Sequence, residues 1–462
     1  MKILVQKFGG TSVDSEESRS KAAGKIVRAI GNGWSVVVVV SAIGRDGAPY
    51  ATDTLVKFLK SVDSNTLPAA REMDMMMACG EIMSTVVMAQ TLRARGYETI
   101  ALTGGQAGIA TDYEFGNARI ISIDPAYVVR MLEVGKIVFV AGFQGVTEYG
   151  AVTTLGRGGS DTTASALGAA LKPYAKEIAV EIYTDVDGVR TADPRQVKEA
   201  RRLNKATYEE VAEMAHLGAK VVHPRAAEIA HLYRIPLWVK STFADAEGTL
   251  ITADEDCDDK VQQRVTGITH TGKIVYLRFP LPANGEIDKG QVEMEIYRIL
   301  QKAAIPLYLN STDGNAFAFA VAREHLPTLI NLLNGLAIPV ENRTNGVNRV
   351  YLLGLGQRNI AFETQRILLE KASSVLDVRA VEAEVTNNCT VVSVISGRFR
   401  GIPGVTARML EALARVGVPV YQTADSPLSV SVLVPEEDAG KATRALHVIF
   451  ELATEDSVDG RT

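Results

Sequence analysis

The first half of this sequence alternates between short apolar runs and longer segments of helical character. Apolar runs occupy 35–42 (SVVVVVSA), 97–104 (YETIALTG) and 136–143 (KIVFVAGF), and a Met-rich helical stretch covers 71–95. The runs are apolar throughout instead of alternating with polar residues, which is typical of parallel strands covered by helices on both faces. A further round of the pattern follows, and we predict one α/β domain at 1–255.

The second half has shorter elements and begins after an acidic, polar linker at 244–264. Two related pieces follow, one beginning at VYLRFPL and the other at TVVSVIS. In each piece a helix is followed by a turn and a short strand that starts with Ile-Pro or Val-Pro. This similarity predicts a duplicated small α+β module. Neither copy has a cluster of acids, bases or nucleophiles, so regulation or assembly is the favoured role, with a purely structural pair as the alternative.

Charge and cysteine content exclude several classes of function. The chain of 462 residues carries 49 basic and 54 acidic residues, a formal charge of -5, which favours a small-molecule substrate over nucleic acid or an anionic membrane. Cys79, Cys257 and Cys389 lie far apart, so we predict neither a disulfide framework nor a metal site. The apolar runs are shorter than a membrane span and the amino terminus leads directly into a strand, so we expect a soluble, cytoplasmic protein.

The segment KFGGTSV at 7–13 places a lysine where an apolar strand ends. Ligands of parallel sheets bind at the carboxyl edge of the strands. The N–H groups of Gly9 and Gly10 could hold a phosphate there, and Lys7 would add a positive charge. The local pattern is equally compatible with a surface lysine before an ordinary strand-to-helix turn.

The segment GRGGSD at 156–161 combines three glycines with Arg157 at the start of an Ala-rich helix. Such a loop is suited to bind carboxylate or phosphate oxygens. The hydroxyl of Ser160 and the carboxylate of Asp161 are also ordinary helix-capping groups.

Two more stretches carry polar groups that packing does not explain. The segment 183–195 (YTDVDGVRTADPR) follows a strand and is rich in charge, which favours a nucleotide-contacting loop over a simple turn. Glu81 lies among apolar residues in MDMMMACGEIMS, where a buried carboxylate would need a partner or a function. The alternative is that Glu81 lies on the exposed face of its helix. We interpret the methionines of this stretch as core packing.

The motifs KFGGTSV, VVVVSAIG, YATD, ACGE, GFQG, GRGGSDTTA, YTDVDGVRTADPR and GAKVVHPRA, in this order, resemble the aspartokinases of the amino acid kinase superfamily. The remainder resembles a tandem pair of ACT-type domains. The resemblance implies a three-layer α/β/α sandwich with a mostly parallel central sheet, followed by two ferredoxin-like α+β regulatory domains. We place the first regulatory region at 265–380, with an apparent insertion near 310–350, and the second at 381–456.

The resemblance also implies an activity and the residues that serve it. Aspartokinases transfer the γ-phosphoryl group of ATP, with Mg²⁺, to the side-chain carboxylate of L-aspartate, a first step toward lysine, diaminopimelate, threonine and methionine. Lys7 and Asp161 match the catalytic positions. The matching substrate-binding positions are Ser41, Thr52, Glu81, Arg157 and Ser160, with Arg157 for the α-carboxylate and Glu81 for the ammonium group. The matching nucleotide-binding positions are Lys7, Gly9, Gly10, Tyr183, Thr184, Asp185, Arg190, Arg195 and Lys220.

The ACT-type modules imply a homodimer or higher homo-oligomer that binds an end-product amino acid as a feedback inhibitor. Lysine, threonine and diaminopimelate are the three candidate effectors, and the sequence does not choose among them. Two alternatives to an aspartokinase remain. A kinase of the same fold could act on another acidic or carbamoyl substrate, although Glu81 with Arg157 fits an amino acid zwitterion. A catalytically inactive amino acid sensor could have kept the same fold. The presence of Lys7, Asp161 and Arg157 argues against this alternative.

Overall fold

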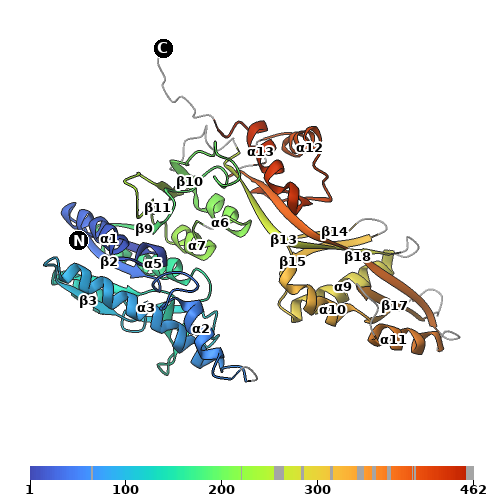
Figure 1. Ribbon diagram of the computed structural model, residues 1–462, viewed down its shortest axis with the longest axis horizontal. Coiled ribbons are helices and arrows are strands. Elements are labelled where there is room, and N and C mark those ends of the chain that lie inside the picture. Colours follow the sequence, from blue (N-terminus) through green and yellow to red (C-terminus); the bar gives the residue numbers. More distant parts are fainter. Residues whose placement is uncertain are drawn as a thin grey trace, which may run out of the picture. The chain divides into compact units, whose positions relative to one another are not determined.

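The apolar runs of the first half form the strands of one sheet in the computed structural model (Figure 1). The structure describes residues 1–63, 66–219, 221–253, 265–281, 286–312, 316–340, 348–355, 360–371, 376–397, 399 and 402–453. The chain divides into two units. The first comprises Met1–Ile268, Ile395–Pro403 and Phe450–Thr462, and the second comprises Thr269–Val394 and Gly404–Ile449. The predicted domain boundaries stay predictions.

The main sheet of the first unit has eight strands in the order β10-β12-β11-β9-β1-β2-β6-β3. Their bounds are β1 (Lys2–Phe8), β2 (Ser35–Val40), β3 (Thr99–Leu102), β6 (Ile137–Ala141), β9 (Glu177–Thr184), β10 (Lys205–Thr207), β11 (Leu237–Ser241) and β12 (Thr249–Thr252). All neighbours run parallel except β11 and β12. The mostly parallel sheet predicted from continuous apolar runs is confirmed.

Helices cover both faces of this sheet. The described helices of this unit are α1 (Glu16–Gly31), α2 (Thr52–Lys60), α3 (Ala70–Arg93), α4 (Ala126–Glu133), α5 (Gly159–Leu171), α6 (Tyr208–His216) and α7 (Pro224–Leu232), of which α2 packs on α3. Residues of β1 alternate between two cores, because successive side chains of a strand point to opposite faces. Val5 packs in the core that contains Leu167 of α5, and Phe8 packs in the core that contains Ile26 of α1. The three-layer arrangement is therefore confirmed.

A small second sheet lies in the same unit, with the order β5-β4-β7-β8. Its strands are β4 (Ile109–Thr111), β5 (Ile120–Ile123), β7 (Gln144–Val146) and β8 (Val152–Thr154). The first residue after β8 is Leu155, which leads into the GRGGSD segment, so this sheet carries the amino-terminal side of that loop. Short 3₁₀ turns in the described chain include η1 (Gly10–Ser12) and η2 (Lys172–Tyr174).

The Met-rich helix α3 is long and apolar enough to cross a membrane by length and composition, a test that core helices of soluble proteins also pass. In the first unit it packs against β3, β6 and β8. Met88 is fully buried in the core, whereas Met75 is half exposed. The methionines thus pack in part against the core and in part line the surface of the unit.

The second unit contains a mixed sheet with the order β14-β15-β13-β18-β17-β16, to which β20 and β19 add beside β18. The strands are β13 (Gly267–Pro280), β14 (Leu309–Thr312), β15 (Ala316–Ala322), β16 (Ala337–Val340), β17 (Asn348–Leu355), β18 (Leu376–Ile395), β19 (Gln422–Asp425) and β20 (Ser429–Pro435). The helices and 3₁₀ turns are α9 (Glu286–Lys302), η4 (Arg323–His325), α10 (Leu326–Leu333), α11 (Ile360–Lys371), α12 (Val405–Arg415), η6 (Glu436–Asp438) and α13 (Ala439–Ile449). The two α+β regulatory modules expected here are confirmed.

The strand β15 lies within the segment described above as an apparent insertion near 310–350. It pairs with β13 on one side and with β14 on the other. Phe317 and Phe319 of this strand stack with Phe279 of β13 in the core of the unit. This part of the segment is therefore an interior strand of the regulatory sheet.

Replacing Phe139 by Ala tests the core of the main sheet. Phe139 lies on β6 and is fully buried, so its loss should reduce the free energy of unfolding of the first unit by about 3–5 kcal/mol. Phe58 on α2 is 66% exposed, and Phe58→Ala should change that free energy by less than about 0.5 kcal/mol. Urea unfolding followed by circular dichroism measures both. Equal effects of the two substitutions would contradict the assignment of this core.

Candidate active site

An ion pair joins the end of β1 to the start of α5. Nζ of Lys7 lies 2.8 Å from Oδ1 of Asp161, and the two side chains are only 13% and 12% exposed. Asp161 is in the first turn of α5, where the helix dipole favours a negative charge. Lys7 therefore lies at the carboxyl edge of the sheet, as predicted, and is held in place instead of extending freely into solvent.

The glycine turn after β1 lies against two other turns. The N–H of Gly9 donates to the carbonyl of Tyr183 (3.4 Å), and the carbonyl of Gly10 accepts from the N–H of Gly44 (3.1 Å). A Cβ atom on Gly10 would lie 2.5 Å from the carbonyl oxygen of Gly44. Only glycine at this position allows the turns after β1 and β2 to approach so closely.

The GRGGSD turn is fixed from the side of α7. Gly158 has φ +70°, and a Cβ atom there would collide with the ring of His223. The backbone N–H of His223 donates to Oδ2 of Asp161 (3.2 Å), so the same residue holds both the turn and the acid. Ser160 is buried beside Gly142, and Arg157 is exposed.

A buried carboxylate positions the strand that leads to Arg157. Asp74 of α3 is fully buried and accepts hydrogen bonds from the N–H of Gly116 (2.9 Å) and from the N–H and hydroxyl of Thr154 (both 2.8 Å). Thr154 is the last residue of β8, three residues before Arg157. The sequence reasoning missed Asp74. The argument that singled out Glu81, a carboxylate among methionines, applies equally to Asp74 in the same stretch.

Glu81 is buried on the inner face of α3. Its Oε1 accepts from the N–H of Ala42 (3.1 Å), and its Oε2 has no hydrogen-bond partner among the described residues. Burial raises the pKa of this carboxyl group to about 8, against the weaker opposing effect of the Ala42 hydrogen bond. Ala42 follows Ser41, whose N–H donates to the carbonyl of Phe8 (3.1 Å). Glu81 is thereby linked to the segment that carries Ser41 and to the end of β1.

Thr52 lies at the other end of this segment, as the first residue of α2. The helices α2 and α3 pack together. A Cβ atom on Gly80 would lie 2.8 Å from the Cβ of Ala42 and 3.2 Å from the carbonyl of Tyr50. Gly80 thus allows α3 to come close to the chain between Ser41 and Thr52.

The start of the loop after β9 is held by one hydrogen bond and by one ion pair to the segment after β2. Thr184 donates to Asp185 (3.1 Å), and Asp185 pairs with Arg45 (2.7 Å). Arg45 was not identified from the sequence, although a charged residue just after a buried strand marks the carboxyl edge of a sheet.

The two predicted arginines of this loop pair with carboxylates close to them in the sequence. Arg190 pairs with Asp187 (2.9 Å) and Arg195 with Asp193 (2.7 Å). Both arginines are thus engaged by carboxylates of their own loop. Lys220 lies outside the described residues.

Tyr183 turns its side chain to the other face of the sheet. Its ring stacks on Phe8 with centroids 4.8 Å apart, and its hydroxyl donates to Glu181 (3.0 Å). Burial, reinforced by the charge of Glu181, raises the pKa of the tyrosine hydroxyl. Only the main chain of Tyr183 therefore reaches the Gly9 turn.

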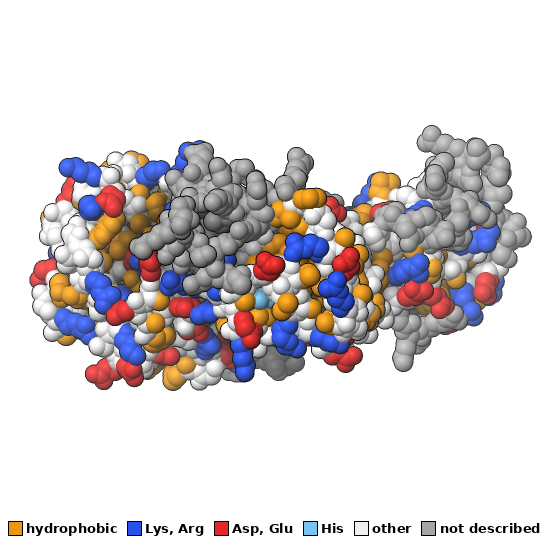
Figure 2. Space-filling view, turned by 90° about the horizontal axis from the view of Figure 1, so that it is seen from above, with side chains coloured by type: hydrophobic (Ala, Val, Ile, Leu, Met, Phe, Trp, Pro, Cys, Tyr) orange, Lys and Arg blue, Asp and Glu red, His pale blue; other side chains and the backbone are white. Residues whose placement is uncertain are grey.

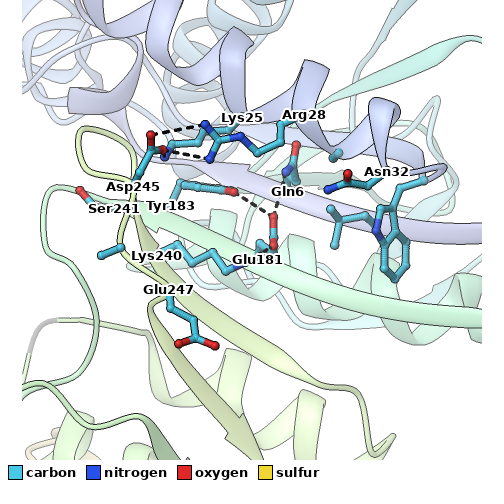
Figure 3. Close-up of a pocket in the computed structure, with 14 residues that line it drawn as sticks. Gln6, Lys25, Arg28, Asn32, Glu181, Tyr183, Lys240, Ser241, Asp245 and Glu247 are labelled. Atoms are coloured by element: carbon cyan, nitrogen blue, oxygen red, sulfur yellow. Dashed lines mark hydrogen bonds and ion pairs between the residues drawn. The ribbon is translucent and has the colours of Figure 1, made fainter.

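Figure 3 shows the pocket of about 270 Å³ that this tyrosine lines, between α1 and β11. At its floor Glu181 accepts from Gln6 (2.8 Å) and Lys240 (2.6 Å) as well as from Tyr183. Asp245 at its rim pairs with Lys25 (2.7 Å) and Arg28. The pocket is thus a polar network whose buried charge is already balanced, on the opposite face of the sheet from Lys7.

The surface charge fits a small-molecule site. On the face shown in Figure 2, basic and acidic side chains of the described residues are interspersed over the molecule.

In the described part of the chain, no group of three or more His, Cys, Asp and Glu side chains is arranged to hold a metal ion.

Replacing Glu81 by Gln tests the burial of this carboxyl group. A group whose pKa rises from 4.5 to about 8 on folding contributes stability in full below pH 4.5, and this contribution is lost as the pH rises to about 8. The free energy of unfolding of Glu81→Gln, relative to that of the wild type, should therefore increase between pH 5 and 9, by about 1.4 kcal/mol for each pH unit by which folding raises the pKa of Glu81. Urea unfolding at a series of pH values measures the difference. A difference that does not change with pH would show that the pKa is not raised.

Two protein families match different parts of this chain, one mainly in each of the two units. Residues 2–241 match the amino acid kinase family, and residues 384–448 match the ACT domain. The chain is 38% identical to aspartokinase 1 of Bacillus subtilis, over 98% of this chain and 100% of that protein. It is 36% identical to the aspartokinase of Geobacillus stearothermophilus, over 98% of each.

The fold is similar to that of E. coli aspartokinase III in complex with aspartate and ADP, with a TM-score of 0.70 over 97% of this chain and 100% of that one. At 23% identity this likeness supports the fold alone. The full-length relatives at 36–38% identity and the kinase and ACT matches establish the family. The chain therefore belongs to the aspartokinases, within the amino acid kinase family.

Proposed function

We propose that this chain transfers the γ-phosphoryl group of ATP to the side-chain carboxylate of L-aspartate, forming 4-phospho-L-aspartate and ADP. The observation that carries the proposal is the ion pair of Lys7 with Asp161. It lies where the glycine turn after β1 meets the amino terminus of α5, a place suited to phosphate oxygens. Aspartate and ADP are bound by the structurally similar E. coli enzyme.

Phosphoryl transfer depends on positioning and on neutralising charge. Lys7 would stabilise the oxygens of the transferring group, and Asp161 would hold the lysine in place. Asp161 has no need to act as a base, because the substrate carboxylate is already ionised near neutral pH. Gly9 and Gly10 would let the phosphates approach the backbone. Magnesium would enter as Mg-ATP, held largely by phosphate oxygens and water.

Glu81 and Arg157 suit the two charges of an amino acid. The raised pKa of Glu81 leaves its carboxyl group largely protonated at pH 7, and a substrate ammonium group would favour the ionised form. Arg157 is exposed and has no ion-pair partner among the described residues, so its guanidinium group is available to the α-carboxylate. Ser41, Thr52 and Ser160 would supply hydroxyl groups around the same substrate.

The nucleotide would lie toward the loop after β9. Thr184 is the last residue of β9 and Asp185 follows it directly, and Asp185 pairs with Arg45. We assign Arg190, Arg195 and Lys220 to the same side, as the family motifs imply. In this assignment Tyr183 contributes its main chain, because its side chain is occupied by Phe8 and Glu181.

The ACT domain implies allosteric regulation. E. coli aspartokinase III has been crystallised with lysine and aspartate, in a structure similar to this chain with a TM-score of 0.64. We propose that lysine, threonine or diaminopimelate inhibits this enzyme, and that it forms a homodimer or larger homo-oligomer through its ACT-type domains. Its substrates ATP and aspartate indicate a cytoplasmic location.

The activity is tested by incubating the purified full-length chain with Mg-ATP and L-aspartate and trapping the acyl phosphate with hydroxylamine. We expect hydroxamate that depends on aspartate, with ADP released in equal amount, and suppression by at least one of the three effectors. Glutamate in place of aspartate serves as the control substrate. Folded protein that binds ATP but forms no hydroxamate with aspartate would refute the proposed reaction.

Lys7→Ala should reduce kcat by about 10²- to 10³-fold, because it removes the charge nearest the transferring group. Asp161 keeps its hydrogen bond from His223 and its place at the helix amino terminus, so the variant should remain folded. Lys2→Ala is the matched control: Lys2 lies on the same strand, half exposed, and pairs with Glu177. Steady-state kinetics measures the activity of each variant and thermal unfolding measures its stability, so together they separate a catalytic role of Lys7 from a structural one. Loss of folded protein in Lys7→Ala would give Lys7 a structural role instead.

A further inference from the structure

Glu210 makes contacts that helix capping does not require. It is the third residue of α6 and is buried, and its Oε2 accepts from the N–H of Thr207 (2.9 Å), while the Thr207 hydroxyl accepts from the N–H of Glu210 (3.1 Å). These two bonds complete a capping box. The other oxygen, Oε1, accepts from the hydroxyl of Thr266 and from the N–H of Gly397 (3.0 Å). One carboxylate therefore joins α6 to two distant segments of the chain.

Those two segments lie where the chain first leaves the first unit, after Ile268, and first returns to it, at Ile395. Thr266 directly precedes β13, and Gly397 lies two residues after the end of β18. The N–H of Thr266 also donates to the carbonyl of Ile395 (2.7 Å), so the outgoing and returning segments are tied together at Glu210. A Cβ atom on Gly397 would lie 3.1 Å from Oε1, a tight contact that glycine avoids.

The outgoing segment also contacts the predicted nucleotide loop. The N–H of Ile268 donates to the carbonyl of Thr191 (2.7 Å). A Cβ atom on Gly267 would meet the side chain of Met214 of α6 and the carbonyl of Thr191. Residues 266–268 are thus packed between α6 and the loop that carries Arg190 and Arg195.

From α6 the contacts continue to the catalytic pair. The chain after α6 turns back on the helix, with the N–H of Ala219 donating to the carbonyl of Met214 (2.8 Å). α6 packs on α7, and α7 packs on α5. His223, at the start of α7, donates its N–H to Asp161, which holds Lys7. A shift of α6 would therefore move the groups that orient Asp161.

We propose that Glu210 is a positioning residue that couples two of the connections to the regulatory unit, beside Thr266 and Gly397, to the Lys7–Asp161 pair through α6 and His223. The inference rests on the proposed kinase activity. An effector that displaces β13 or β18 would act on catalysis through this carboxylate. Coupling between sites of this kind typically changes affinity or rate by about 5- to 150-fold.

Thr266→Val tests the coupling, because valine keeps the shape of the side chain and removes its hydroxyl. We expect kcat per folded molecule to fall about fivefold or more, within the range of such couplings. Thr266→Ser should restore the wild-type rate. Thr269→Val is the matched control: Thr269 is buried three residues further along, and its hydroxyl has no hydrogen-bond partner among the described residues. A purely structural role of the hydroxyl would lower the melting temperature of Thr266→Val without changing kcat, and Thr266→Ser would then restore the melting temperature alone.

Glu210→Gln provides a second variant, because glutamine at this position still permits a capping box. We expect the same loss of kcat as in Thr266→Val. The concentrations of lysine, threonine and diaminopimelate that inhibit by half are measured for each variant, and any effector that inhibits the wild type should act at a changed concentration. Unchanged kcat and unchanged inhibition in both variants would overturn the proposal.

Hydrogen exchange gives a readout that does not depend on activity. In the full-length chain without substrate, Thr266→Val should accelerate amide exchange in α6 and at His223, whereas Thr269→Val should not. Faster exchange confined to residues 266 and 397 would overturn the coupling even if the enzyme is active. Wild-type protein that forms no hydroxamate would refute the proposed reaction instead, and the exchange experiment would still decide whether the coupling exists.

Discussion

The ion pair between Lys7 and Asp161 is the interaction on which the rest of the site depends. A lysine at the end of a strand is useful to phosphoryl transfer only if its charge is held where the phosphate will lie. Asp161 holds it at 2.8 Å, and the backbone of His223 in turn holds Asp161 at 3.2 Å. The central sheet, α5 and α7 thus converge on one pair of charges.

Glycine makes this convergence possible. The turns after β1 and β2 approach each other at Gly10, and the turn before α5 passes under the ring of His223 at Gly158. A side chain at either position would push apart the elements that carry the ion pair. Asp74 completes the arrangement, because its three hydrogen bonds fix Thr154, just ahead of the same turn. The close contacts between backbone segments that pack this unit therefore also hold the ion pair of the proposed site.

The sequence predicts those parts of the structure that patterns of neighbouring residues determine. Continuous apolar runs predict the parallel sheet, and glycine turns at strand ends predict where Lys7 and Asp161 lie. The contacts that the sequence does not reveal join residues far apart in the chain: Asp74 reaches Thr154 across 80 residues, and Glu210 reaches Gly397 across 187. Periodicity carries no information about such pairs. Tyr183 shows the same limit, because its strand was predicted while the direction of its side chain was not.

The central claim is that phosphoryl transfer takes place at the Lys7–Asp161 pair. A crystal structure of the full-length chain with L-aspartate, Mg²⁺ and a non-hydrolysable ATP analogue tests it most directly. The account predicts that Nζ of Lys7 contacts both Asp161 and a γ-phosphate oxygen, with the aspartate carboxylate on the far side of that phosphate. A γ-phosphate bound on the opposite face of the sheet, in the pocket lined by Glu181 and Tyr183, would contradict it.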